Sequence, residues 1–289
     1  SNVGKIHFWG HEFSLGYNNT FGKFSWQSNF NISFDRNKIV ELVEPGYITR
    51  NTSEYSDYYR NQEGYPLSQF FGYIKLGLYK DEEDLATSPK SSTSQVGTIK
   101  FKDVNKDGVI NVKDRTFIGD PNPDFLFGFT NNFKYSNFDL SISMTGSYGG
   151  KVVNALKHQY LGNLDGAFNI LAAAKDRWRS PEQPGSGDYP RTMTGTTAEH
   201  RKVNTSWIES NSHLAVKNIT LGYTLPLPQN RYCSKLRVYA SIQNVCFISK
   251  YDGANPEVSL NGLNGTGIGV DENSYPVPRV YSLGLNVTF

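Results

Sequence analysis

The chain has 289 residues and a formal net charge of +2 at pH 7, and 37% of its residues are hydrophobic, 14% aromatic and 19% charged. This nearly neutral balance argues against a polybasic nucleic-acid binder. The 18 Tyr and 18 Phe are too many large apolar groups for a disordered coil. No run of about 18 apolar residues is present, which argues against a transmembrane helix, but a membrane β-strand needs only about 9–11 residues with alternate apolar positions.

Neither a signal segment nor a disulfide is expected. The first residues show no basic or apolar segment of an export signal, so we expect any such signal to have been removed or to lie upstream. Cys233 and Cys246 lie on an expected strand, so their Cα atoms would be roughly 40 Å apart, beyond the reach of a disulfide. We therefore expect two free thiols.

Strict alternation of apolar and polar residues runs through seven segments and predicts strands with one apolar and one polar face. A further strand between 37 and 60 stays open. In chain order, the apolar members are Phe13, Leu15 and Tyr17; Phe24, Trp26, Phe30, Ile32 and Phe34; Phe125, Phe127 and Phe129; Phe138, Leu140, Ile142 and Met144; Ile219, Leu221, Tyr223 and Leu225; Leu236, Val238, Ala240 and Ile242; and Tyr281, Leu283, Leu285, Val287 and Phe289.

The polar positions of these strands carry Ser, Asn, Thr, Gln and Gly, with few Lys or Glu. A soluble β-sandwich usually has more charge on its outer face, whereas a membrane barrel turns apolar residues to lipid and uncharged polar residues to its interior. Aromatic residues near strand ends suit the two interfacial girdles of such a barrel. They are Tyr17, Phe34, Tyr148, Tyr223, Phe247, Tyr281 and Phe289. The pattern alone leaves both folds open.

Connection lengths favour the barrel. The segments 80–123, 149–212 and 249–279 are long and polar, while the connections at 135–137 and 226–235 are short. Outer-membrane barrels alternate in this way, with short periplasmic turns and long external loops. We therefore predict an all-β fold, namely the C-terminal strands of a large transmembrane antiparallel β-barrel over residues 1–289.

The long loop 149–212 and the last strand, 281–289, have predicted features of their own. Val152–Tyr160 and Ala167–Arg179 have helical composition, so the 149–212 loop is expected to contain short helices. The strand 281–289, with Tyr281, Leu283, Leu285, Val287 and Phe289 on its apolar side, is expected to close the barrel. Counting back from this strand places all three long loops outside.

The 80–123 loop contains an EF-hand-like segment at 103–114. Its spacing predicts oxygen ligands for Ca²⁺ or Mg²⁺, with Gly108 at the sharp turn. The last ligand position holds Asp rather than Glu, and no paired second loop is present, so a structural ion fits better than a calcium sensor. The alternative is an Asx-turn-rich loop that keeps its shape without metal. The predicted ligands are Asp103, Asn105, Asp107, Val109, Asn111 and Asp114.

No catalytic constellation stands out, so we do not expect an enzyme. The nucleophile elbow, the His-Glu-x-x-His helix and the phosphate-binding glycine loop are all missing from the sequence. His7 and His11 would be about 13 Å apart on a strand, too far to share a metal. The run 82–84 is expected to be a solvated acidic turn. A glycoside hydrolase fragment would need demonstrated glycan turnover.

Several segments together resemble the C-terminal part of the SusC/RagA-type TonB-linked outer-membrane proteins. The most specific runs from Ile99-Lys100-Phe101-Lys102-Asp103 through Ile118-Gly119-Asp120-Pro121-Asn122-Pro123. The resemblance covers nearly the whole chain, and its other segments are 2–15, 26–38, 71–79, 255–258 and 275–289.

This resemblance implies import of oligosaccharides or peptides across the outer membrane of a Gram-negative bacterium. It also implies a SusD-type surface lipoprotein over the external mouth, and a TonB complex that acts through an N-terminal contact segment and plug. The sequence shows neither the N-terminal contact segment nor the plug, and it has too few strands for a 22-stranded plugged barrel. We therefore expect a piece of a longer protein that needs the remaining barrel in the outer-membrane lipid, or one that closes as a smaller barrel.

Trp178, Trp207 and Tyr251 lie in the long loops and are candidate contacts for sugar rings or for a partner protein. Packing within the loops is the alternative. The competing function is a soluble β-rich carbohydrate-binding or adhesin module with a calcium-stabilised loop, and solubility without detergent would favour it.

Overall fold

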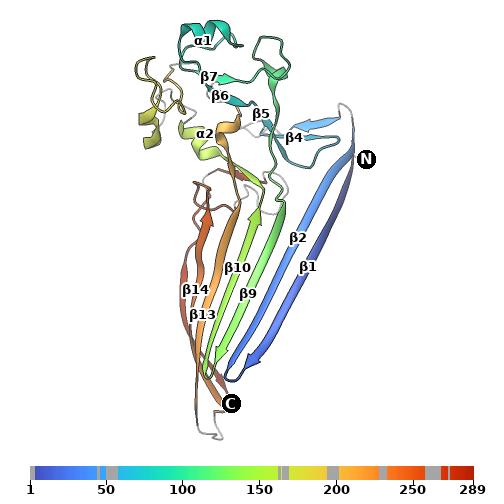
Figure 1. Cartoon of the computed structure of the whole chain (residues 1–289), viewed down its shortest axis with the longest axis vertical. Coiled ribbons are helices and arrows are strands. Elements are labelled where there is room, and N and C mark those ends of the chain that lie inside the picture. Colours follow the sequence, from blue (N-terminus) through green and yellow to red (C-terminus); the bar gives the residue numbers. More distant parts are fainter. Residues whose placement is uncertain are drawn as a thin grey trace.

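The fold consists of one large antiparallel sheet with a cluster of loops and small sheets at one end, here called the head (Figure 1). The head comprises the described residues of 43–123, 149–212 and 249–279. The computed structural model describes residues 4–43, 46–49, 58–161, 164, 169–193, 202–227, 233–257, 268–272 and 274–289.

The large sheet has seven strands in the order β1-β2-β9-β10-β13-β14-β16, and every neighbouring pair is antiparallel. The seven predicted strands are confirmed, and the described residues of the open region 37–60 include the end of β2, the short β3 and the start of β4. The sheet strands are β1 (Gly4–Phe21), β2 (Phe24–Leu42), β9 (Phe125–Tyr135), β10 (Phe138–Tyr148), β13 (His213–Leu225), β14 (Lys235–Ser249) and β16 (Val280–Thr288).

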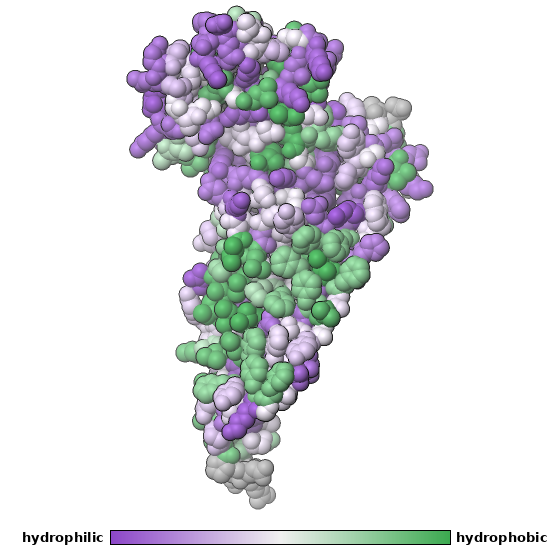
Figure 2. Space-filling view, viewed as in Figure 1, coloured by the Kyte–Doolittle hydropathy of each residue, from purple (hydrophilic) through white to green (hydrophobic). Residues whose placement is uncertain are grey.

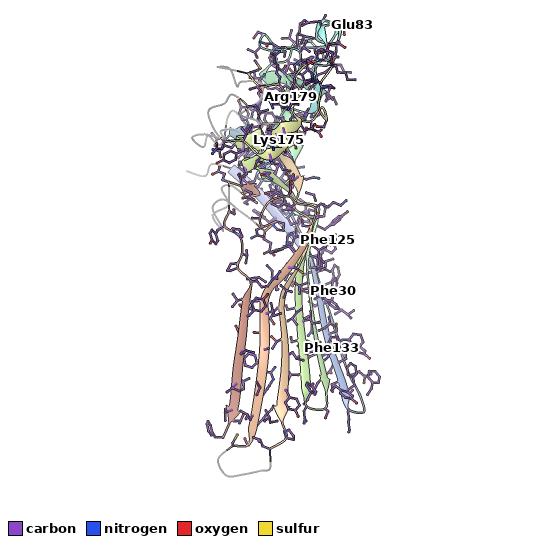
Figure 3. All side chains as sticks on the ribbon, turned by 90° about the vertical axis from the view of Figure 1, so that its left-hand side faces the viewer. Phe30, Glu83, Phe125, Phe133, Lys175 and Arg179 are labelled. Atoms are coloured by element: carbon purple, nitrogen blue, oxygen red, sulfur yellow. The ribbon has the colours of Figure 1, made fainter. Side chains whose placement is uncertain are left out.

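Strand register gives the sheet two chemically different faces, since alternate residues point to opposite sides. One transverse row is apolar and consists of Leu15, Phe30, Phe129, Met144, Val216 and Cys246. The adjacent row on the other face is polar and consists of Gly16, Asn29, Thr130, Ser143, Asn218 and Gln243. Figure 2 shows the apolar face as a continuous green area over the sheet, and Figure 3 shows Phe30, Phe125 and Phe133 projecting from it.

The apolar face is not covered by a second layer in the described part of the chain. Leu15 is 72% exposed, Leu221 51% and Leu283 87%. A β-sandwich would bury such side chains between two sheets about 10 Å apart, so the sandwich alternative does not describe this fold. None of the described helices is long and apolar enough to cross a membrane.

The head holds most of the buried apolar side chains. One cluster includes Phe70, Val153 and Trp207, and another includes Ile99, Phe101 and Trp178. The small strands are β3 (Tyr47–Thr49), β4 (Tyr59–Gln62), β5 (Gln69–Gly72), β6 (Lys75–Leu78), β7 (Ile99–Phe101), β8 (Thr116–Gly119), β11 (Lys151–Asn154), β12 (Ile208–Ser210) and β15 (Val270–Asp271); the helices are α1 (Glu82–Thr87), α2 (Ala155–Leu161) and the 3₁₀ turns Val112–Asp114, Ala172–Asp176 and Thr205–Trp207.

The predicted helices of the 149–212 loop are only partly correct. Residues 152–154 belong to β11, because Val152 and Val153 are fully buried and pair with β12. The helix α2 begins at Ala155, and the second helical segment contains only the 3₁₀ turn Ala172–Asp176 among its described residues. Residues 167 and 168 of that prediction lie outside the described part of the chain.

The expected solvated turn at 82–84 is instead the first turn of α1. Asp81 caps this helix, because its side chain accepts a hydrogen bond from the backbone N–H of Asp84. The acidic residues of the first turn also interact favourably with the helix N-terminus.

Candidate functional site

The polar face of the sheet carries one charged pair that crosses a strand. Arg237 on β14 donates hydrogen bonds to Asp139 on β10, with Nε 2.8 Å and Nη2 2.5 Å from the two carboxylate oxygens. On the intervening strand β13, Gly222 pairs with Asp139 on one side and with Tyr239 on the other, while Arg237 pairs with Thr224. A Cβ at Gly222 would lie 2.3 Å from Nη2 of Arg237, so the glycine leaves the room that the guanidinium occupies as it crosses β13. The pair ties three strands together.

Among the described residues, the apolar face contains a partly buried polar pair. The indole Nε1 of Trp26 donates a hydrogen bond of 3.0 Å to Oδ1 of Asn131. Asn131 is only 6% exposed, and Trp26 stacks on the neighbouring Phe133 with ring centroids 6.3 Å apart. The amide is thus covered by aromatic rings, which lets a polar side chain lie on a face that otherwise presents apolar groups.

A cavity of about 540 Å³ lies where the polar face meets the head. Two of its lining side chains, Thr145 and Asn211, each have a buried oxygen atom without a hydrogen-bond partner. The lining also includes Glu12, Ser147, His213 and Glu257. Polar strand residues and head loops therefore form one concave surface, and neither part forms it alone.

An ion-pair cluster fixes the loop at this cavity. The Nδ1 atom of His213 lies 2.7 Å from the backbone oxygen of Asn211, and Nε2 lies 3.4 Å from Oε1 of Glu257. Lys217 forms a further ion pair with Glu257. The hydrogen bond from His213 and the contact with Lys217 hold the pKa of the Glu257 carboxyl below its usual value, in spite of partial burial. The loop after β14 is thereby anchored to the start of β13.

The three predicted aromatic contacts all lie inside the head. Trp178, Trp207 and Tyr251 are 6%, 3% and 8% exposed. The ring of Trp178 lies where a Cβ on Gly97 would be, and the Tyr251 hydroxyl donates to Oδ2 of Asp271 at 2.6 Å. These contacts fit the alternative of loop packing. Contact with a ligand stays a prediction, and Trp207 lines a cavity in the head.

The 103–114 loop folds as a tight set of side-chain to backbone hydrogen bonds. Asp103 accepts from the N–H groups of Lys106 and Gly108, and Asp107 accepts from Val109. Asp114 is fully buried and accepts from two further N–H groups of the loop, those of Val104 and Asn111.

Metal binding by this loop stays a prediction. Among the described residues, no group of three or more His, Cys, Asp or Glu side chains is placed to hold a metal ion. The predicted ligand set adds the amide side chains of Asn105 and Asn111 and the carbonyl of Val109 to its carboxylates. The side chain of Asn105 hydrogen-bonds to Asp107, and that of Asn111 to the Val109 carbonyl, so the predicted oxygen atoms are gathered at one turn.

Three charged residues have no signal in the sequence: Lys75, which lines a cavity in the head, and His213 and Glu257, which line the cavity at the polar face. Lys75, His213 and Glu257 are isolated charged residues in the chain, and each meets its partners across 40 or more residues or through backbone atoms. Only the pairing of strands and the convergence of loops bring them to a shared wall.

The chain has similar sequences and similar structures among known proteins. No family model matches the chain. It is 34% identical over 300 residues to the TonB-dependent receptor P26 of Formosa agariphila, covering 100% of this chain and 30% of that protein. It is 28% identical to the TonB-dependent receptor SusC of Bacteroides thetaiotaomicron, covering 100% of this chain and 27% of SusC.

Among solved structures, the chain is similar to one described as the RagAB peptide transporter, with a TM-score of 0.78 and 19% identity. That match covers 99% of this chain and 29% of the other. The chain thus spans about 30% of the length of the relatives it matches.

Proposed function

Since the chain belongs to the TonB-dependent receptors of the SusC and RagA type and corresponds to a C-terminal part of them, we propose that it forms part of the wall and the external mouth of an outer-membrane nutrient importer. The protein would lie in the outer membrane of a Gram-negative bacterium. In this role it provides a passage and a binding surface and catalyses no reaction.

The observation that carries this proposal is the two-faced sheet with its head at one end. The apolar face exposes large side chains without a covering layer, as a surface in contact with lipid requires. The opposite face carries Asn, Ser, Thr and Gly, which suit a water-filled interior. The three long loops meet at one end, while the short turns lie at the other (Figure 1).

The two outer strands of the sheet imply the remaining barrel as a partner. Within the described part of the chain, β1 pairs with β2 alone and β16 pairs with β14 alone. Unpaired backbone groups at a sheet edge cost several kcal/mol each in lipid, so we propose that these edges pair with further strands of the same receptor. The Arg237–Asp139 pair on the polar face would then face the interior, where a plug would lie.

We place the lipoprotein contact and the ligand at the head. A SusD-type lipoprotein would cover the external mouth formed by 80–123, 149–212 and 249–279, and energy would come from a TonB complex. The ligand would be an oligosaccharide or a peptide. Support comes from the relative named SusC and from a structural neighbour described as a peptide transporter. We further propose that the 103–114 loop binds Ca²⁺ or Mg²⁺ and stiffens this mouth.

The experiment that tests the function combines fractionation with growth. An antibody against 255–289 should detect the protein in the outer-membrane fraction, and deletion of the gene should abolish growth on the oligosaccharide or peptide source that induces it. Loss of the TonB complex should give the same growth defect. A band in the soluble fraction, with unchanged growth after deletion, would instead support the adhesin or carbohydrate-binding alternative.

A further inference from the structure

A hollow of about 530 Å³ lies at the boundary between the apolar face of the sheet and the head. Its lining includes Tyr148, which lies on β10 in the same register as Met144 of the apolar row. It also includes Ile248, which lies on β14 in the same register as Cys246 of that row. Alternate residues of a strand share a face, so both side chains point to the apolar face, where they are 56% and 63% exposed. The polar residues around the hollow are Asp124, Lys151, Ser210, Ser212, Ser249 and Lys250.

This hollow is distinct from the cavity of about 540 Å³ at the polar face. That cavity is lined by Ser147, the neighbour of Tyr148, whose side chain points to the opposite side of the sheet. The hollow at the apolar face thus opens toward the surface that we propose to lie in lipid, whereas the other cavity opens toward the interior.

The charges of the apolar face begin at its head end. On the described strands, the apolar-face positions between the short turns and this end carry no Lys, Arg, Asp or Glu. Arg36 and Lys38 then follow Phe34 at alternate positions of β2, and Lys250 follows Ile248 beyond β14. Figure 2 shows the green area of this face ending where the mostly purple head begins. Basic side chains therefore mark the edge of the apolar surface.

The two lysines of the hollow are exposed and have no counter-ion in the described part of the chain. Neither Lys151 nor Lys250 forms an ion pair with a described carboxylate. The acidic residue of the lining, Asp124, instead lies 4.0 Å from Nη2 of Arg36, which also donates through Nη1 to the Asp124 backbone oxygen at 2.8 Å. The hollow therefore carries an excess of positive charge.

The serines of the lining form a hydrogen-bonded group between the two lysines along the chain. The Oγ atom of Ser212 accepts hydrogen bonds from the Ser210 hydroxyl at 3.1 Å and from the backbone N–H of Gly149 at 3.0 Å. Since both bonds use its lone pairs, the hydroxyl proton of Ser212 is left as a donor. The wall thus combines two ammonium groups with hydroxyl groups, which are groups that hydrogen-bond to phosphate oxygens.

We propose that this hollow binds the phosphate group of an anionic membrane lipid. The ammonium groups of Lys151 and Lys250 neutralise the phosphate, and the lipid chains lie over Tyr148 and Ile248. The argument is the junction itself, because positive charge and exposed apolar side chains adjoin in one hollow, and an anionic lipid has both complementary parts. Free phosphate would use only the charge. The proposal rests on the proposed function, since lipid reaches the hollow only if the apolar face lies in the membrane.

The test titrates lipids onto the full receptor purified in detergent and counts bound molecules by native mass spectrometry. The probes are dioleoylphosphatidate, dioleoylglycerol, which has the same chains without the phosphate, and inorganic phosphate. We expect phosphatidate to bind more tightly than either of the other two, because only phosphatidate has both the charge and the chains. Equal binding of dioleoylglycerol would overturn the role of the phosphate, and equal binding of inorganic phosphate would overturn the assignment to a lipid.

Variants of the two lysines locate the site. The double variant Lys151→Gln and Lys250→Gln should weaken phosphatidate binding about thirtyfold, because it removes both positive charges. Its thermal unfolding midpoint should stay within error of that of the parent receptor, since both side chains are exposed. Lys175→Gln is the matched control, as this exposed lysine lies in the head beyond the hollow (Figure 3) and should leave binding unchanged. Unchanged binding by the double variant would overturn the proposal.

A variant that gains affinity separates the site from the fold. Asp124→Asn removes the carboxylate from the lining and should strengthen phosphatidate binding about threefold, a result that a misfolded receptor cannot give. Weaker or unchanged binding would contradict the proposed electrostatics. A receptor that imports normally but binds no phosphatidate would overturn this site alone, whereas one that binds phosphatidate through both lysines but imports nothing would contradict only the import function.

Discussion

At the residue scale, glycines on the polar face decide which side chains can cross neighbouring strands. Gly222 makes room for Arg237, and Gly284 lies beneath the ring of Tyr239, where a Cβ would be 2.4 Å from the ring. Neither glycine has a left-handed backbone conformation, so the requirement is one of space. The sheet thus has contacts between strands that the alternation of apolar and polar residues does not predict.

Gly222→Ala should therefore destabilise the sheet. The added methyl group displaces the guanidinium of Arg237 and breaks its bonds to Asp139, which we expect to cost about 1–3 kcal/mol. The measurement is the temperature at which the folded receptor loses its faster migration in unheated gels. Gly16→Ala is the matched control, since its Cβ meets only the flexible amide of Asn29 at 3.3 Å. Equal effects of the two variants would contradict the role of Gly222.

The Glu257 cluster predicts a pH dependence. Its carboxyl pKa is lowered in the folded protein by His213 and Lys217, so its contribution to stability is present above the pKa of the unfolded chain. The contribution is lost as the pH falls through the lower folded pKa. Because the partners are partly exposed, we expect about 0.5–1 kcal/mol.

The check compares thermal unfolding of the parent protein and Glu257→Gln from pH 5.5 to pH 3. The parent should be more stable at the upper end, and the difference should shrink as the pH falls and Glu257 becomes protonated. A difference that stays constant across this range would show that the carboxylate charge is not responsible.

At the element scale, the head shows how short elements depend on their surroundings. Residues 152–154 were predicted as helix, but two buried valines there pair with Ile208 and Glu209 as a strand. The acidic run 82–84 was predicted as a turn, yet the cap by Asp81 makes it helical. In both places a local preference is weak, and a neighbouring strand or cap decides the outcome.

The 103–114 loop gives a prediction at the same scale. If Ca²⁺ binds there, calcium at about 100 times its Kd should stabilise the loop by about 2.7 kcal/mol, measured as slower proteolysis of the head. Asp107→Ala should abolish this calcium effect, because Asp107 supplies a predicted ligand. Glu82→Ala in α1 should retain it. If calcium does not slow proteolysis of the parent protein, the loop keeps its shape without a metal ion.

At the scale of the whole molecule, the separation of the two faces is the main determinant of the fold. Apolar side chains gather on one face of the large sheet (Figure 2), while the buried core lies in the head. A water-soluble globular protein instead buries the apolar faces of its sheets and exposes polar side chains. The arrangement is consistent with a sheet whose solvent on one side is lipid.

Adjacent substitutions on β1 test this separation. Leu15→Arg places a charge on the exposed apolar face and should cost about 2–4 kcal/mol in a membrane, whereas Ser14→Arg points to the polar face and should be tolerated. The measurement is the fraction of receptor recovered folded in the outer membrane. If both variants fold equally well, the apolar face does not contact lipid.

The sequence by itself determined the strands, their two faces and the end at which the long loops gather. These properties follow from an alternation of period two and from the order of long and short connections, both of which are local in the chain. It also identified the family, through segments spread over nearly the whole chain. The sequence could not show that Trp178 and Tyr251 are buried, that Arg237 reaches Asp139 across Gly222, or that Lys75 and Trp207 line one cavity. These contacts join residues far apart in the chain, so only strand register and the convergence of the long loops in the head decide them.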